Sequence, residues 1–434
     1  MRIIADLHIH SKFSRATSSN MEIPEIAHYA RLKGLNLVGT GDFTHPNWMR
    51  ILEEGLTSDE TGIHKPKNDP QSPIHFILGT EVSTIFEFEN TTRKVHHVIL
   101  TPSFGVAKQI IERLSHYGDL VTDGRPTLRM SAAELVEVVT QISSENEVLP
   151  AHAWTPWFSI FGAFNGFDRL EDCYQDMSSK IHALETGLSS DPPMNWRISS
   201  LDRLVLVSNS DSHSPWPWRI GREANIFELN KMDYGEILEA FRAKDKNKLM
   251  CTIETGPEYG KYHWTGHRNC KFSVPPPEAI ALNNICPICH RKLTKGVDQR
   301  VEELADRPKG YRLRSSADYV HLLPLHEIIA ATLKMEALSS PKIWDIYNSA
   351  ISHFSDEYNI LLNASEKELN AVIDPLIVKA IMRVRNGQVK IEPGYDGVYG
   401  KIVLEEDEVP EKRTKNTSVR KEEQMKLDDY SEGI

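Results

Sequence analysis

Apolar and polar positions follow patterns that predict strands and helices in turn through about residue 245. Four short apolar runs predict strands at residues 3–7, 35–40, 148–150 and 204–208. Residues 24–33 predict a helix that Gly34 ends, and Ser131 with Glu134 predicts a capping box that opens a helix reaching about residue 143. Strands that alternate with helices indicate an α/β fold.

The pattern changes further along the chain. Residues 315–390 carry apolar positions at helical spacing, with a second capping box at Ser365 and Glu368. From Glu405 the chain is charged and nearly devoid of apolar residues, so we expect a disordered tail. Within the first half, residues 57–73 are rich in Pro, Asp, Ser and Lys and predict a loop insertion.

A carboxylate and two imidazoles share one face of the first predicted strand. Because side chains alternate along a strand, Asp6, His8 and His10 point to one side while the intervening residues face a core. Further potential ligands follow later apolar runs: Asp42, Glu81, His97, His152, Asp211 and His213. Side chains at the carboxyl ends of parallel strands converge when the strands close into a barrel. A lone histidine would more often be an ordinary core or surface residue, but this series predicts a metal centre.

A second set of residues has the spacing of a structural zinc site. His267 and Cys270 form one pair, and Cys286 and Cys289 form another sixteen residues on. Two pairs at this separation are typical of a closed tetrahedral site for zinc. The alternatives for the fourth ligand are His263, His290 and Cys251. Cys173 is expected to be an ordinary buried thiol, because scattered cysteines provide no disulfide framework.

Composition and charge narrow the class of protein. The 434 residues are 40% hydrophobic and 26% charged, which fits a globular enzyme of several domains. The net charge of −11 argues mildly against indiscriminate nucleic-acid binding. Residues 291–314 nevertheless carry a local excess of Lys and Arg, which either forms a salt-bridged surface or neutralises phosphates. Its position beside the zinc ligands favours nucleic acid.

No membrane association is expected. The sequence has no apolar stretch long enough to span a bilayer, and its first residues enter a strand directly instead of a signal peptide. We therefore expect a cytoplasmic protein.

Aromatic residues follow two of the predicted ligand positions. Most should pack against the rim of the barrel, although a group of rings beside a metal centre can also wall a pocket for an extruded base. The candidates for contact with DNA or with its bases are Trp154, Trp157, Trp216, Trp218, Arg291, Lys292 and Lys295.

A short motif lies near the carboxyl end. Gln424, Leu427 and Tyr430 place an aliphatic and an aromatic residue one helical turn apart after a polar residue. This spacing resembles the sliding-clamp-binding box, with Ser431 in place of the second aromatic residue. We therefore expect a clamp of the PCNA type as a partner.

The ordered ligand series resembles the PHP family, the polymerase and histidinol phosphatase superfamily. The matching positions are His8, His10, Glu81, His97, His152, Asp211 and His213. The resemblance implies a distorted (β/α)7 barrel in which Glu81 bridges two metals. Many members have Thr-Asp-His where this chain has Gly41-Asp42-Phe43-Thr44-His45, so either Asp42 or His45 takes the ligand role. Some members carry a further histidine where this chain has Ser14, Arg15 and Ala16.

A longer resemblance covers nearly the whole chain. The segment from Gly260 to Cys270, the Cys-Pro-Ile-Cys run ending at Cys289, and residues 301–307 closely resemble the endonuclease Q family. This implies a metal-dependent DNA-repair endonuclease that hydrolyses the phosphodiester 5′ to a deaminated base (uracil, hypoxanthine or xanthine) or to an abasic site. The alternatives are a PHP-type small-molecule phosphoesterase and a non-catalytic repair scaffold.

The resemblance also implies roles for the residues. Divalent ions in the barrel, whether Zn, Mg or Mn, would activate water and polarise the phosphate of damaged DNA. Asp211, Glu81 and His8 would be catalytic, while Asp6 and Glu185 would hold ligand histidines in the correct tautomer. We expect a catalytic barrel at 1–248, a zinc-binding module at 249–314, a helical C-terminal domain at 315–404 and a disordered tail at 405–434.

Overall fold

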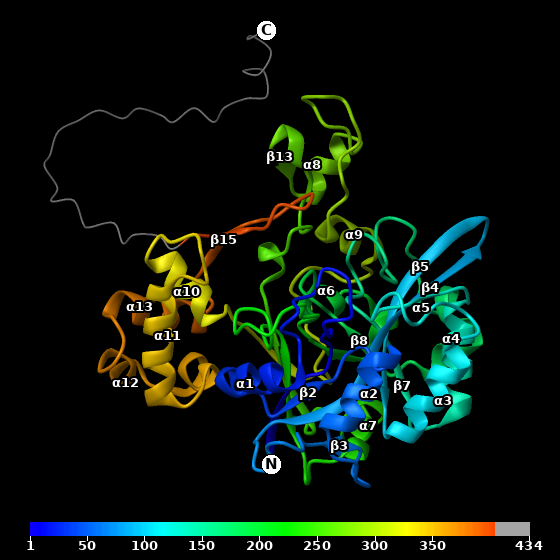
Figure 1. Cartoon of the computed structure of the whole chain (residues 1–434). Coiled ribbons are helices and arrows are strands. Elements are labelled where there is room, and N and C mark those ends of the chain that lie inside the picture. Colours follow the sequence, from blue (N-terminus) through cyan, green and yellow to red (C-terminus); the bar gives the residue numbers. More distant parts are fainter. Residues whose placement is uncertain (404–434) are drawn as a thin grey trace, which may run out of the picture. The chain divides into compact units, whose positions relative to one another are not determined.

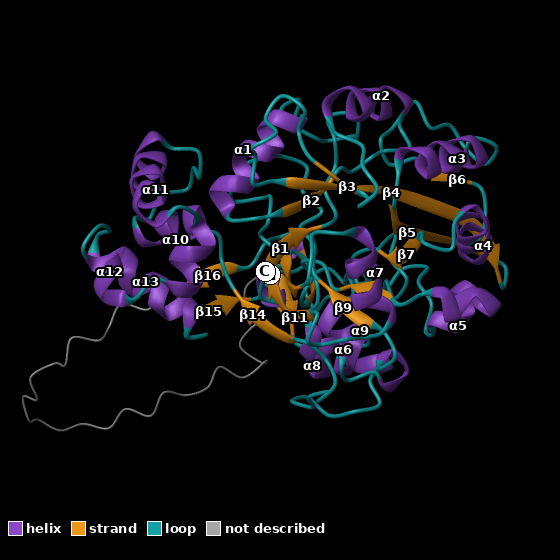
Figure 2. Cartoon of the chain, turned by 90° about the horizontal axis from the view of Figure 1, so that it is seen from below, coloured by secondary structure: helices purple, strands orange, loops and turns teal. Residues whose placement is uncertain are grey.

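The computed structural model describes residues 1–403, which form one compact unit with an α/β fold. A ten-stranded sheet has the order β14-β11-β10-β1-β2-β4-β5-β7, and β3 and β6 also pair with β4 (Figures 1 and 2). Its strands are β1 (Arg2–Asp6), β2 (Leu37–Gly39), β3 (Ile63–His64), β4 (His75–Phe88), β5 (Thr91–Thr101), β6 (Thr127–Leu128), β7 (Glu147–Pro150), β10 (Ala224–Glu228), β11 (Leu249–Glu254) and β14 (Asp318–His321). The predicted α/β class is confirmed.

The sheet is mixed and curls back on itself. β1 is parallel to β2 but antiparallel to β10, and β4 and β5 form a long antiparallel hairpin. The expectation that ligands follow parallel strands is therefore wrong for β5, which is antiparallel to both β4 and β7, whereas β4 is parallel to β2 and carries Glu81 within the strand. A separate parallel pair, β8 (Ala183–Glu185) and β9 (Val205–Val207), lies beside β7. A bridge between Ile9 and Ser212 then brings the residues after β9 against those after β1.

Helices cover the outside of the curled sheet, and α1 to α5 follow one another around it in Figure 2. The left-handed Gly34, at φ 97°, ends the first helix as predicted, and Ser131 accepts a hydrogen bond from the Glu134 N–H at the start of α4. The helices of this region are α1 (Ile23–Lys33), α2 (Pro46–Gly55), α3 (Phe104–Leu114), α4 (Ala132–Ile142), α5 (Leu170–Tyr174), α6 (Pro192–Asn195) and α7 (Tyr234–Arg242). The predicted insertion at 57–73 contains only the short strand β3.

The sheet extends beyond the predicted domain boundaries at residues 248 and 314. β11 pairs antiparallel with β10, and β14 returns to pair in parallel with β11. The chain between them stands out from the sheet at the top of Figure 1. It contains β12 (Thr265–His267), β13 (Phe272–Val274), α8 (Pro276–Ala281) and α9 (Val297–Leu304).

The C-terminal region is helical and is fastened to the first part of the chain. Lys33 at the end of α1 forms a buried ion pair of 2.7 Å with Glu357, and the ring of Trp218 lies 4.8 Å from that of His326. Ser365 and Glu368 form the predicted capping box. The elements are α10 (Leu325–Thr332), α11 (Pro341–Phe354), a π-helical turn (Asn359–Asn363), α12 (Glu366–Asn370), α13 (Pro375–Arg385) and the hairpin of β15 (Lys390–Glu392) and β16 (Lys401–Val403).

Within residues 1–403, no helix has the length and apolar character needed to cross a membrane. The predicted clamp-binding residues Gln424, Leu427 and Tyr430 lie outside the described residues.

Candidate active site

Glu81, in β4, lies at the centre of the candidate site and is fully buried. Its Oε1 lies 2.7 Å from His96 Nδ1 and 3.0 Å from His152 Nε2. Its Oε2 lies 3.1 Å from His10 Nε2 and 3.6 Å from His8 Nε2. One carboxylate therefore joins four histidines from three different segments of the chain.

Two sets of potential metal ligands share this carboxylate. The ligand atoms of His8, His10, Glu81 and Asp211 lie within 4.8 Å of one another, as do those of Glu81, His96 and His152. Nε2 of His8 is buried and has no hydrogen-bond partner among residues 1–403, so it is available to a metal. Imidazole and carboxylate groups together suit zinc and similar divalent ions. The residues therefore fit two metal ions with Glu81 between them.

The backbone is strained where three of the site residues leave their strands. Asp42, His152 and Asp211 have φ values of 47°, 31° and 49°, in the left-handed region that favours glycine. Each follows a strand, namely β2, β7 and β9, and the sharp turn directs its side chain inward. Such strain is concentrated at functional sites and is stabilised by the surrounding structure.

Glu185, at the end of β8, takes the positioning role predicted for it. Its carboxylate accepts a hydrogen bond from Nδ1 of His8 at 3.0 Å and another from the backbone N–H of His152 at 2.9 Å. Burial alone would lower the pKa of His8, but Glu185 and Glu81 outweigh that effect and hold this pKa well above its usual value. With Nδ1 protonated toward Glu185, Nε2 faces the centre of the site.

Asp6 acts on the backbone and not on a histidine, which differs from its predicted role. Its carboxylate accepts hydrogen bonds from the N–H and the hydroxyl of Ser210, at 3.1 and 2.6 Å, and from the Gly221 N–H at 2.9 Å. Burial raises the pKa of Asp6 to about 6. Asp6 therefore holds the segment that carries Asp211.

Asp42 lies behind His10 and is in neither ligand set, in contrast to its prediction as a ligand. Its Oδ1 is 3.0 Å from His10 Nδ1, and its Oδ2 accepts hydrogen bonds from Ser11 and Ser14. The alternative ligand, His45, is turned away: its Nε2 lies 2.9 Å from the Val121 carbonyl, and its ring stacks 4.3 Å from that of Phe13. The structure therefore gives Asp42 the same positioning role for His10 that Glu185 has for His8.

The prediction of His97 as a ligand is wrong, and His96 occupies that place. In the β4–β5 hairpin His96 pairs with Ser83, so its side chain shares a face with Glu81, whereas His97 pairs with Val82 and points to the opposite face. His97 instead contacts Thr84 and the Tyr174 hydroxyl, at 3.0 and 2.9 Å. The two adjacent histidines could not be told apart before the register of the hairpin was known.

Asp211 and His213 lie together at the open side of the site. Oδ1 of Asp211 is 2.9 Å from His10 Nε2. Burial would raise the pKa of Asp211, but His10, His8 and His213 hold this pKa far below its usual value. His213 donates from Nδ1 to the Asp211 carbonyl at 2.8 Å, and its ring centre lies 4.4 Å from that of His10. His213 thus borders the first ligand set without belonging to it.

Arg125 is a site residue that the sequence analysis did not identify. Its Nη1 lies 3.1 Å from Oε2 of Glu81. Arg125 follows the Asp-Gly turn signal at residues 123 and 124, and such a signal marks a loop without indicating what the loop approaches.

The second predicted metal site also comes together. The ligand atoms of His267, Cys270, Cys286 and Cys289 lie within 4.8 Å of one another, with Cys289 Sγ 3.2 Å from His267 Nδ1. The alternatives His263, His290 and Cys251 are outside this group, and Cys251 belongs to β11 in the main sheet. A Cys3His set of this kind fits structural zinc.

The tryptophans predicted as DNA contacts divide into buried and exposed residues. Trp154 is fully buried and donates to Asn195, and Trp218 is 8% exposed, so both serve packing and the predictions for these two are wrong. Trp157 is 41% exposed, while Trp216 is half-buried and stacks with Trp218. Phe158, which was not among the candidates, is also exposed, and its ring centre lies 5.0 Å from that of His96.

Most of the basic segment takes part in ion pairs. Lys295 pairs with Glu303 at 2.7 Å, whereas Arg291 and Lys292 are exposed. Further pairs join Arg300 to Asp168, Arg307 to Asp202 and Lys309 to Asp298. The surface available for phosphate contacts is therefore smaller than the count of cations suggests.

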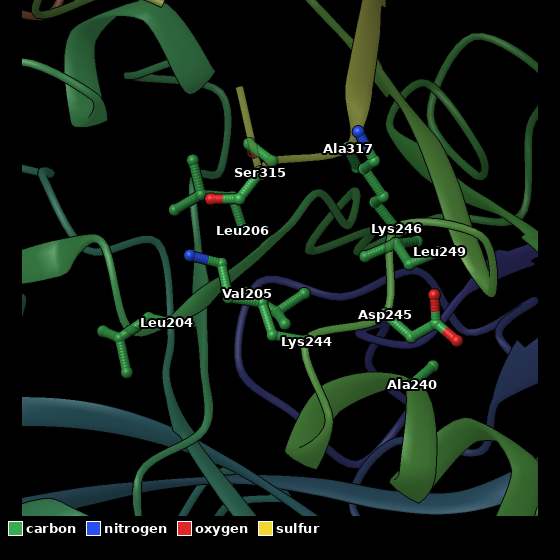
Figure 3. Close-up of a pocket in the computed structure, with 11 residues that line it drawn as sticks. Leu204, Val205, Leu206, Ala240, Lys244, Asp245, Lys246, Leu249, Ser315 and Ala317 are labelled. Atoms are coloured by element: carbon green, nitrogen blue, oxygen red, sulfur yellow. The ribbon is translucent and has the colours of Figure 1, made fainter. Parts of the chain in front are cut away.

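Figure 3 shows a separate pocket whose lining includes none of the predicted ligands. Its walls come from β9, α7 and the segment before β14. The lining residues are Leu204, Val205, Leu206, Ala240, Lys244, Asp245, Lys246, Leu249, Ser315, Ser316 and Ala317.

Sequence comparisons find relatives over parts and over the whole of the chain. Residues 324–388 match the family described as the MJ0043 C-terminal domain. The chain is 34% identical over 262 residues to "Uncharacterized protein MJ0043" of Methanocaldococcus jannaschii, which covers 59% of the chain and 32% of that relative. The chain therefore spans about a third of that protein's length. It is 26% identical over 416 residues to "Uncharacterized protein YqxK" of Bacillus subtilis, covering 92% of the chain and 99% of the relative.

Two solved structures match nearly the whole chain, each with 34% identity and a TM-score of 0.83. One is the lesion-specific endonuclease PfuEndoQ from Pyrococcus furiosus, with 93% of this chain and 95% of that chain covered. The other is endonuclease Q in complex with a 27-mer duplex substrate that has an abasic lesion at the active site, with 94% and 97% covered. Matches of this length and identity show that the chain belongs to the endonuclease Q family of phosphodiester hydrolases.

Proposed function

We propose that this protein is a metal-dependent DNA-repair endonuclease that cleaves the phosphodiester 5′ to a deaminated base (uracil, hypoxanthine or xanthine) or to an abasic site. The observation that carries the proposal is the convergence of two ligand sets on the single buried carboxylate of Glu81. Its support from relatives is the match over 93% of the chain to a lesion-specific endonuclease. We further propose that the curled sheet is a distorted (β/α)7 PHP barrel.

In this proposal His8, His10, Glu81 and Asp211 hold one divalent ion, and Glu81, His96 and His152 hold a second. Such ions, whether Zn, Mg or Mn, supply Lewis-acid polarisation of the phosphate and activation of water. The protein's own part is orientation. Glu185 and Asp42 accept the Nδ1 protons of His8 and His10, which leaves Nε2 of each ring as the ligand atom. Asp211, Glu81 and His8 are the catalytic residues.

DNA contacts are proposed for those members of the predicted set that are not buried. Trp157 and Trp216 lie on the loops that follow His152 and His213, where an aromatic face can stack on a base. Arg291, Lys292 and Lys295 lie beside the four zinc ligands, and there they would contact the DNA backbone. The zinc site of His267, Cys270, Cys286 and Cys289 keeps this module folded.

The decisive experiment incubates purified protein and Mn²⁺ or Mg²⁺ with matched duplexes that carry one uracil, hypoxanthine, xanthine or abasic site, with an undamaged duplex as control. Cleavage 5′ to the lesion alone is expected, and the Asp211→Ala variant should be inactive. Release of phosphate from histidinol phosphate without DNA nicking would instead establish a small-molecule phosphoesterase. DNA binding without either reaction would establish a scaffold.

We also propose that a sliding clamp of the PCNA type binds Gln424, Leu427 and Tyr430. The support is the spacing of an aliphatic and an aromatic residue in a charged segment. Calorimetry with the clamp should show binding that the combined substitutions Leu427→Ala and Tyr430→Ala abolish, while nicking of a short duplex is unchanged. Native clamp affinity in the double variant would contradict this proposal.

A further inference from the structure

A permanent cation lies beside the carboxylate that the two ligand sets share. Nη1 of Arg125 is 3.1 Å from Oε2 of Glu81, the oxygen that also faces His10 and His8. The Arg125 side chain is 27% exposed while that of Glu81 is fully buried. The guanidinium group therefore covers Glu81 from the open side of the site.

The loop that carries Arg125 is fixed on both sides. Asp123 accepts hydrogen bonds from the backbone N–H groups of Arg15 and Arg125, and Gly124 donates to the Phe13 carbonyl at 3.0 Å. On the other side, the Pro126 carbonyl accepts from the Ser83 N–H at 2.9 Å. The loop is thus held by the segment after His10 and by β4 at once.

Gly124 shows how closely this loop approaches the site. A Cβ atom at this position would lie 2.4 Å from Oδ2 of Asp42 and 2.5 Å from Oγ of Ser14, distances that no side chain can adopt. The backbone before Arg125 therefore packs directly on the carboxylate that orients His10. Its neighbour Arg125 is preorganised at the site and does not reach it as a flexible surface arginine would.

Glu81 does not depend on this arginine alone, because nitrogens of His10, His96 and His152 already lie within 3.1 Å of its oxygens. A guanidinium group is always charged, and like charges at close range in a partly buried site repel one another strongly. The carboxylate of Glu81 balances part of this charge, and an anionic substrate among the bound cations would balance the rest. The planar group offers several further N–H donors to such an anion.

We propose that Arg125 binds a non-bridging oxygen of the scissile phosphate and is a catalytic residue for cleavage. This inference rests on the proposed endonuclease function and deepens it. A donor fixed before the substrate arrives stabilises the charge that develops on phosphate in the transition state at no cost in reorganisation. Arg125 would thus add a fixed positive charge beside the phosphate that bound metal ions would polarise.

The test compares Arg125→Ala and Arg125→Lys with Arg129→Ala, which removes an exposed cation four residues along the same segment. Single-turnover cleavage of an abasic duplex should slow by about 10² to 10³ fold in Arg125→Ala. Lysine should restore only part of the rate, because it cannot donate two parallel hydrogen bonds. Arg129→Ala should cleave at the rate of the unaltered protein. Added guanidinium ions should raise the cleavage rate of Arg125→Ala but not that of the other proteins.

A second measurement distinguishes two roles for Arg125: binding the scissile phosphate, or only holding Glu81 in place. The scissile phosphate is replaced by each phosphorothioate diastereomer, and cleavage rates and bound metal are measured for each protein. If Arg125 binds one oxygen, the difference in rate between the two diastereomers should shrink in Arg125→Ala while the metal content is unchanged. The inference would be overturned if the rate difference between the diastereomers were unchanged in Arg125→Ala, or if bound metal were lost in proportion to activity. Should the alanine variant fold poorly, Arg125→Lys provides the same measurement.

The unaltered protein supplies the reference for both claims. If it does not cleave the abasic duplex, the proposed function fails, and the role of Arg125 fails with it. If it cleaves the duplex but the Arg125 variants do not show the expected changes in rate, only the proposed role of Arg125 is overturned.

Discussion

His96 and His97 are adjacent in β5, yet their imidazoles point to opposite faces of the β4–β5 hairpin. His96 Nδ1 lies 2.7 Å from Glu81, whereas His97 Nδ1 lies 2.9 Å from the hydroxyl of Tyr174 in the core. Burial lowers the pKa of both rings, to about 4 for His96 and about 3 for His97. Both are therefore neutral at pH 7, but only one can serve as a ligand.

This relationship predicts different outcomes for two matched substitutions. His96→Gln should lower the amount of bound metal and the cleavage rate with little effect on the unfolding of metal-free protein. His97→Gln should keep the metal but lower the free energy of unfolding by about 1 to 3 kcal/mol, since it disturbs buried hydrogen bonds. Elemental analysis and thermal unfolding distinguish the two. The reverse pattern would restore His97 as the ligand.

Asp211→Asn should abolish lesion cleavage while DNA affinity stays within a few fold of that of the unaltered protein. The substitution keeps the shape of the side chain but removes a carboxylate ligand from a site that His8, His10 and Glu81 still form. Fluorescence anisotropy with an abasic duplex measures binding, and a nicking assay measures turnover. A variant that remains active at saturating metal would refute the role of Asp211.

Cys286→Ser should release one zinc ion per chain and destabilise the segment between β11 and β14, because a structural zinc site contributes directly to folding. Cys251→Ala is the matched control, since Cys251 lies in the main sheet outside the zinc ligands. Zinc content and limited proteolysis report the effect. Equal zinc in both variants would show that the four residues do not hold the ion.

Stability should fall as the pH rises through the range in which Glu254 ionises. Burial raises the pKa of Glu254 from 4.5 to about 7, so the folded protein binds more protons than the unfolded chain between these values. The stabilisation is complete below about pH 4.5 and is lost as the pH approaches 7. Glu254→Gln should remove the part of this slope that Glu254 contributes and raise the free energy of unfolding above pH 7, on the order of 3 kcal/mol. Denaturant unfolding from pH 5 to 8 measures it, and parallel curves for both proteins would contradict it.

Lys33→Met should destabilise the protein by about 3 to 5 kcal/mol, because it leaves Glu357 buried without its cation. Adding Glu357→Gln should recover much of this loss, since the amide oxygen can still accept the hydrogen bond from the Leu325 N–H. A double-mutant cycle of chemical unfolding measures the coupling between the two residues. Additive losses would show that the pair does not fasten α1 to the C-terminal helices.

Local sequence patterns predicted much of the fold and of the candidate site. The other site residues depend on strand pairing and on contacts between distant loops. The strand that precedes His8 and His10, the helix ended by Gly34 and the capping box at Ser365 depend on neighbours in the sequence and were predictable. The choice between His96 and His97 depends on pairing across a hairpin, and the place of Asp42 depends on how two loops meet. Arg125 belongs to no motif, because its function arises only where its loop packs against residues 13 and 14.

The return of the chain to β14 has a consequence for any attempt to remove the segment between β11 and β14, which contains the four predicted zinc ligands. β11 and β14 are parallel neighbours, with Cys251 opposite Asp318 and Glu254 opposite His321. Parallel strands cannot be joined by a tight turn and need a crossover of about a dozen residues or more. The segment with the four predicted zinc ligands is therefore also the linker that allows β14 to enter the sheet. A deletion that joins residue 254 to residue 318 would leave β14 unable to pair with β11. A shortened protein would therefore need a replacement crossover before β14 could join the edge of the sheet.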